Sequence, residues 1–152
     1  MAWTNKGKMR GLEAYFRNVG APTNFYVALV TSATAPSATT NTLSDLTEIA
    51  AGNGYSSGGY QLTPNDTDFD VLNENDDNNR GEIQIKDVTW TATGGSIPAS
   101  GSGARYAVLT DDHATVGSRE VIDYWSLGSD RSVSDGQDLT LQNLEIRITE
   151  PV

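Results

Sequence analysis

The sequence predicts a mainly β protein, an antiparallel jelly-roll or a β-sandwich or barrel with one short N-terminal helix. Two observations predict this class. About seven short apolar segments are separated by turn signals, a spacing typical of antiparallel sandwiches and barrels. Thr, Ser, Asn and Gly supply 56 of the 152 residues, and small polar residues favour turns and strand edges over long helices. The length fits one core, so we divide the chain into an N-terminal arm with the helix at residues 1–22 and a single β domain at 23–152.

One apolar stripe predicts the helix. Its members recur at steps of three, four and three residues: Met9, Leu12, Phe16 and Val19. Thr4 or Asn5 is the expected N-cap, and Gly20 followed by Pro22 is the expected stop. Because Gly7 within the helix weakens it, we expect the helix to pack on the body of the protein or on a partner.

The remaining chain reads as strands. The predicted strands are residues 25–31, 60–62, 69–72, 83–90, 105–110, 120–127 and 139–148. The first is apolar throughout, which is typical of a strand buried on both faces. The alternation slips by one residue after Ile85 and again at Asn143, and we interpret these slips as β-bulges. Residues 43–51, within a long polar segment, predict one or two helical turns.

Charge separates the N-terminus from the rest of the chain. The net charge is −10, yet residues 1–20 carry +3 and residues 21–152 carry −13. An acidic body repels nucleic acid and anionic membranes, so neither is an expected partner. No apolar run approaches the roughly 20 residues of a membrane span, and no secretory signal is found at the start. We therefore expect the chain to be made in, and at first released into, a cytoplasm.

The candidate metal ligands are carboxylates. Cysteine is absent and histidine occurs once, which excludes disulfides, thiolate sites and histidine-rich metal sites. Acidic residues recur at every second position from Asp66, and calcium takes such oxygen ligands. The calcium hypothesis uses four of them: Asp66, Asp68, Asp70 and Asp76. An EF-hand does not fit, because Val71 stands where that loop needs glycine. The alternative is a solvated acidic hairpin tip, and no other cofactor is expected.

No catalytic signature is found. His113 follows two aspartates, but the chain has no G-x-S-x-G turn that would present a serine beside it. Twenty acidic residues produce chance carboxylate pairs, so such pairs carry no information. We therefore predict no enzyme. Tyr124 and Trp125 are adjacent in a strand and point to opposite faces, so that one belongs to the core and the other could anchor a partner or stack on a sugar. Trp3 is expected to be an exposed aromatic of the same kind.

Two segments carry a resemblance to a known group of proteins. They are ARYAVLTDD at residues 104–112 and SVSDGQDLT at residues 132–140. With FYVALVTSATAP from residue 25 onward, their order resembles small virion proteins of tailed bacteriophages, a group that includes capsid decoration (cement) proteins and tail or fibre components. The resemblance extends over roughly residues 10–150.

The resemblance implies a structural protein of the virion. On this reading the chain binds the outer head surface and stabilises the capsid, with the major capsid protein and copies of itself, as a trimer, for partners. The alternative is a tail or tail-fibre component or a carbohydrate-binding module for the host surface. The residues expected to grip the partner are the basic, apolar and aromatic ones of the N-terminal arm: Trp3, Lys6, Lys8, Met9, Arg10, Leu12 and Phe16.

Overall fold

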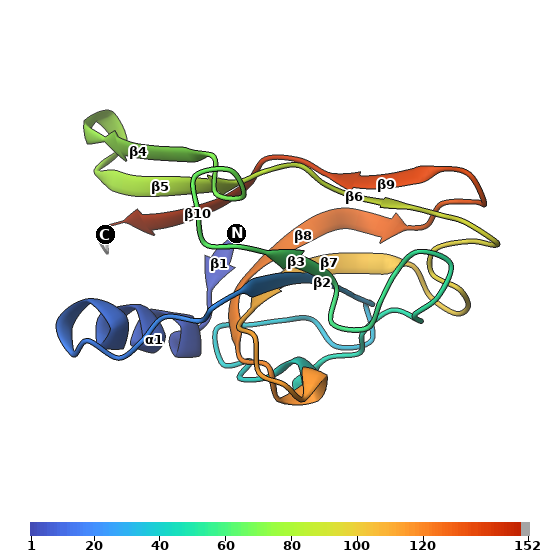
Figure 1. Ribbon diagram of the computed structural model, residues 1–152, viewed down its shortest axis with the longest axis horizontal. Helices are drawn as coiled ribbons and strands as arrows, with labels where there is room; N and C mark the ends of the chain where they lie inside the picture. The colour runs from blue at the N-terminus through green and yellow to red at the C-terminus, as the bar shows by residue number, and fades with distance from the viewer. Residues whose placement is uncertain (150–152) are drawn as a thin grey trace.

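Two stacked layers of antiparallel strands make up the protein in the computed structural model, which describes residues 1–149 (Figure 1). One layer is a five-stranded sheet with the order β1-β8-β7-β2-β3. Its strands are β1 (Ala2–Trp3), β2 (Phe25–Val30), β3 (Tyr60–Leu62), β7 (Ala104–Thr110) and β8 (Val121–Arg131). The predicted fold class is confirmed, as a β-sandwich with one helix near its N-terminus.

The second layer contains the remaining strands in two groups. β4 (Val71–Asn75), β5 (Arg80–Ile85) and β10 (Leu144–Thr149) form a sheet with the order β10-β5-β4, and β6 (Val88–Thr91) pairs with β9 (Asp138–Leu141). The main core lies between the two layers, where side chains such as Ile85, Trp90 and Leu109 are buried. The last three residues of the expected β domain, 150–152, lie outside the described residues.

Strand β2 is buried on both faces, as its apolar sequence predicts. Val27 and Leu29 point into the core between the layers. Ala28 and Val30 pack on the outer side against Leu43, in the long segment between β2 and β3. That segment holds only one helical turn, η1 (Leu43–Asp45), so the helical prediction for residues 43–51 is correct only at its start.

The two predicted bulges are wrong, because each slip separates two strands. β5 ends at Ile85 and β6 begins at Val88, while β9 ends at Leu141 and β10 begins at Leu144. The pairing register is unchanged across the interruption: Ile85 lies opposite Leu144 before it, and Val88 lies opposite Leu141 after it. Each strand therefore has two residues, instead of one, between its core-facing positions at the interruption. Ile85 and Val88 on one strand, and Leu141 and Leu144 on the other, consequently all face the core.

Other strand boundaries also differ from the prediction. The strand expected at 69–72 begins at Val71 and runs to Asn75, because Phe69 instead packs in the core with its ring centroid 5.7 Å from that of Phe25. Strand β8 continues four residues beyond Leu127.

Within the described residues, no helix is long and apolar enough to cross a membrane.

The N-terminal residues join the five-stranded sheet. Strand β1 pairs with β8, with Trp3 opposite Asp123, and the side chain of Thr4 is completely buried and caps helix α1 (Asn5–Phe16) by accepting a hydrogen bond from the Gly7 N–H at 2.9 Å. The first turn of α1 is thus part of the folded body. The helix ends before Gly20, since Asn18 adopts a left-handed conformation with φ of 53°.

Candidate functional site

Helix α1 is attached to the body by its first turn. Gly7 is buried against the backbone of Ile122 in β8, where a side chain would not fit. Glu120 holds the next turn, because its carboxylate accepts a 2.6 Å bond from Arg10 and lies 3.6 Å from the Lys6 ammonium. The Arg10 guanidinium, and to a smaller extent Lys6, keep the pKa of Glu120 below its usual value. Lys6 and Arg10 therefore already form ion pairs with Glu120 of the same chain.

The apolar stripe of α1 points away from the body. Met9 is 41% exposed, Leu12 59% and Phe16 74%, and we call these three residues the helix stripe. The sequence pattern left open whether the stripe packs on the body or on a partner, and the structure leaves it in solvent. Lys8 is exposed beside it.

Trp3 is not the exposed aromatic that the sequence suggested. Its side chain is half-buried against the main core. Its indole N–H donates a 2.7 Å hydrogen bond to the carbonyl of Arg147 in β10. Trp3 therefore joins the edges of the two layers, and its pairing partner in β8 lies 120 positions along the chain, which no local pattern reveals.

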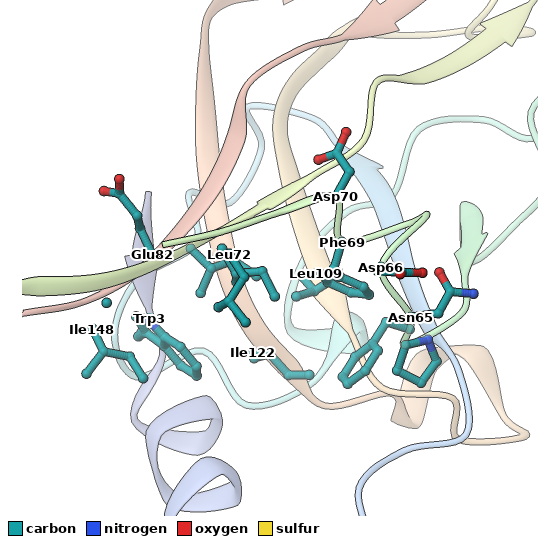
Figure 2. Close-up of a pocket in the computed structure, with 15 residues that line it drawn as sticks. Trp3, Asn65, Asp66, Phe69, Asp70, Leu72, Glu82, Leu109, Ile122 and Ile148 are labelled. Atoms are coloured by element: carbon teal, nitrogen blue, oxygen red, sulfur yellow. The ribbon is translucent and has the colours of Figure 1, made fainter. Parts of the chain in front are cut away.

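An apolar groove opens between the two layers beside Trp3 (Figure 2). Its volume is about 650 Å³. We define the apolar groove by its main lining side chains, which come from five separate segments: Trp3, Phe25, Phe69, Leu72, Ile146 and Ile148. In Figure 2, Leu72 and Ile148 lie close to Trp3 around the opening, while α1 lies outside it. The sequence analysis missed this groove, because its lining is assembled only by the tertiary fold.

Carboxylates border the groove. Asp66, Asp70 and Glu82 are among the residues that line it. Glu82 is bound to Arg80 at 2.6 Å, whereas Asp66 and Asp70 form no ion pair with any residue between 1 and 149. The groove therefore combines an apolar interior with an acidic rim.

All the exposed large hydrophobic side chains of residues 1–149 come from the helix region and from the two edge strands at the groove. They are Met1, Met9, Leu12, Tyr15, Phe16, Val19, Val71, Leu72 and Ile148. Figure 1 shows α1, β4 and the end of β10 at the same end of the molecule. We call this region the apolar end. A concentration of this kind on an acidic protein is typical of a surface that contacts another macromolecule.

The four carboxylates of the calcium hypothesis do not come together. Among residues 1–149, no group of three or more acidic or histidine side chains is placed to hold a metal ion. Asp68 turns inward to bind the Lys86 ammonium and to accept a 2.7 Å bond from the Thr63 N–H, and both donors lower its pKa. Asp66 and Asp70 stay exposed near the groove, and Asp76 lies in the exposed β4–β5 hairpin tip. The hairpin alternative is correct for Asp76.

Replacing Lys86 should therefore destabilise the protein, because Asp68 would keep a largely buried charge without its cation. For Lys86→Met we expect a loss of about 1 kcal/mol in the free energy of unfolding at pH 7, or a melting temperature lower by about 2–4 °C, in differential scanning calorimetry. The matched control is Lys8→Met, since Lys8 is exposed and forms no ion pair within the described chain. Equal melting temperatures for the two variants would contradict this role of Lys86.

One acidic group is buried beneath β1. Asp123 is fully inaccessible to solvent. Its Oδ1 accepts a 2.7 Å bond from the Tyr124 N–H, while its Oδ2 has no hydrogen-bond partner among the described residues. Burial raises the pKa of Asp123 to about 6, against the opposing effects of the Tyr124 amide and the N-terminal charge. We therefore expect the stability of the folded state to depend on the protonation of Asp123.

The remaining candidates have structural places. Trp125 belongs to the main core and donates to the Glu145 carbonyl at 3.1 Å, whereas Tyr124 packs on the opposite face, as predicted. Trp125 is thus excluded as a sugar platform. His113 lies in an exposed loop, where its Nδ1 accepts from the Thr115 N–H at 3.1 Å.

Comparison of the chain with known proteins finds no matching family model, no matching curated protein and no matching solved structure.

Proposed function

We propose that this chain is a non-enzymatic structural protein of a tailed-bacteriophage virion, a decoration protein that binds the outer surface of the head and stabilises the capsid. The observation that carries the proposal is the apolar end, which gathers the exposed large hydrophobic side chains on one part of an acidic β body. A body of this kind is suited to attach by one end to other proteins. The major capsid protein and further copies of the chain, in a trimer, are the proposed partners.

Two further observations support this reading. The segments that resemble small virion proteins of tailed bacteriophages form β7 with the start of the following loop, and the loop that leads into β9 with the first residues of that strand. They therefore belong to the folded β body. The body also carries 19 acidic and 6 basic residues after position 20. Such a charge is compatible with the outside of a head, where the protein does not meet the packaged DNA.

Antibody-gold labelling of purified particles tests the location. Particles from a lysate that expresses the chain are labelled and viewed by negative-stain electron microscopy, and particles lacking the chain serve as control. We expect gold over the whole head. Gold confined to the tail or fibres would replace the proposal by the adsorption alternative, and particles without gold would refute a virion role.

The capsid-stabilising role has its own measurement. Heads that lack the chain should release their DNA at a lower temperature than complete heads, as followed by a DNA-binding dye during heating. Adding the purified chain should restore the higher temperature, because a ligand that binds only the intact lattice stabilises it. If the chain binds the heads but the DNA-release temperature does not change, the chain attaches without stabilising the capsid. The stabilising role would then be wrong.

A further inference from the structure

We propose that the apolar groove of one copy of this chain receives the helix stripe of a second copy. This deepens the proposed function, because it names the partner of the apolar end. Its test uses the purified chain without any particle, so that either proposal can fail while the other holds.

The helix stripe and the groove are complementary in shape and polarity. The stripe presents Met9, Leu12 and Phe16 from successive turns over about 11 Å, all more than 40% exposed. The groove offers about 650 Å³ among aromatic and aliphatic side chains, which lies within the range of pockets that hold apolar groups. Among residues 1–149, the helix stripe stays exposed and the groove stays open. Both surfaces are apolar, so each is suited to bury the other.

The helix cannot fill the groove of its own chain. Its first turn is fixed on β8 by Gly7, whose ideal Cβ would lie only 2.3 Å from the Ile122 carbonyl oxygen. The ion pairs of Lys6 and Arg10 with Glu120 hold the second turn in the same place. The helix stripe can therefore enter only the groove of another molecule.

Charge selects this contact over a helix-to-helix contact. Lys8 and Arg17, near the two ends of the stripe, form no ion pair within residues 1–149, and neither do Asp66 and Asp70 at the groove. Seating the helix stripe in the groove brings these opposite charges together. Packing two stripes against each other would instead face two basic segments, each of net charge +3, which is unfavourable.

The contact joins two different surfaces. It is therefore either exchanged reciprocally between two copies or repeated head to tail, in a closed ring or an open filament. The same geometry explains how α1 persists with a glycine at position 7 and another at position 11. An isolated helix of 12 residues is marginal in water, and contact along its exposed side supplies the packing that its own chain does not.

Mixing two variants tests the pairing. Leu12→Asp with Phe16→Asp disables the helix stripe, and Leu72→Asp with Ile148→Asp disables the groove at side chains that are 80% and 70% exposed. At about 100 μM, where a contact with a Kd of about 10 μM is mostly formed, sedimentation velocity should show an oligomer for the wild type and a monomer for each variant. An equimolar mixture should form a one-to-one dimer, because it contains one competent helix and one competent groove.

The control is Ser129→Asp, at an exposed residue of β8 that belongs neither to the groove lining nor to the apolar end, and it should keep the wild-type oligomer. A monomeric wild type would overturn the inference. An oligomer that survives in either double variant, or a mixture that stays monomeric, would also overturn it, since other surfaces would then make the contact. Circular dichroism and melting temperatures confirm that each variant is folded.

A cross-link gives a second measurement that does not depend on affinity changes. The chain contains no cysteine, so Leu12→Cys in one copy and Leu72→Cys in another introduce the only two thiols. Mild oxidation of the mixture should join the two copies far more than a mixture of Leu12→Cys with Val71→Cys. Equal yields in the two mixtures would reject the seating of Leu12 beside Leu72.

Discussion

Gly7→Ala is expected to loosen α1 from the body of the protein and to lower the free energy of unfolding by about 1–3 kcal/mol, the usual cost of forcing an extra methyl group into a packed contact. The added Cβ would lie 2.3 Å from the Ile122 carbonyl oxygen and 2.8 Å from its Cα. Both atoms belong to the backbone of β8 and cannot rotate away. The first turn of α1 would have to move, together with the cap that Thr4 provides. Urea unfolding followed by circular dichroism measures the change.

Gly11→Ala is the matched control in the same helix. No atom lies within 4 Å of its ideal Cβ, so the methyl group meets nothing. Alanine is the better helix former by about 1 kcal/mol. We therefore expect the free energy of unfolding to rise by up to that amount. The two substitutions should therefore change stability in opposite directions. A Gly7→Ala protein as stable as Gly11→Ala would show that α1 is not held through Gly7.

Asp123→Asn is expected to remove a pH dependence of stability between about pH 4 and pH 7. Burial raises the pKa of Asp123 to about 6 in the folded state, from 3.8 as its ordinary value. The folded state thus binds the proton more tightly, and its advantage is complete below pH 4 and disappears as the pH rises through 6. At about 1.4 kcal/mol for each pH unit, the wild type should lose about 3 kcal/mol over this range.

Asparagine keeps the shape and the acceptor for the Tyr124 N–H but carries no charge. We expect the variant to be more stable than the wild type at pH 7.5, by about 1–3 kcal/mol. In urea unfolding it should lack the loss of stability with rising pH that Asp123 causes in the wild type. Asp66→Asn, at an exposed carboxylate, is the control and should keep the wild-type slope. A slope that persists in Asp123→Asn would mean that another group titrates in this range.

Local patterns predicted the elements that depend on local physics. The continuous apolar run of β2 required burial on two faces, and both faces are covered. The N-cap could be predicted to within one position, as Thr4 or Asn5, because a capping residue just before the periodic residues is itself the signal. The structure selects Thr4. The paired interruption after Ile85 and before Leu144 could not be distinguished from two bulges, because both produce the same one-residue slip in a single strand. Only knowledge of which strands pair separates them.

The candidate site was predictable in its helix and not in its groove. The spacing of Met9, Leu12 and Phe16 identifies the apolar face of α1. The face that packs on the body is instead the opposite one, because only Gly7, which has no side chain, allows the helix to approach β8 closely. The groove requires Trp3, Phe69 and Ile148 to meet from the two ends and the middle of the chain. The sequence pattern places Asp68 among the calcium ligands because its partner, Lys86, is 18 positions away in the interruption between β5 and β6, where no local spacing reveals the pair.

The paired interruption in the second layer has a consequence for how the gene can change. Losing Asp87 alone would leave one residue between Ile85 and Val88, so both would stay on the core face, while two residues would remain between Leu141 and Leu144. The interruption would then become an ordinary β-bulge in one strand. The same holds for a loss of Gln142 in the other strand, whose amide donates a 2.9 Å bond to the Asp87 carboxylate. A single deletion at this level is therefore accommodated as a bulge, and the lengths of the two distant segments can change one at a time.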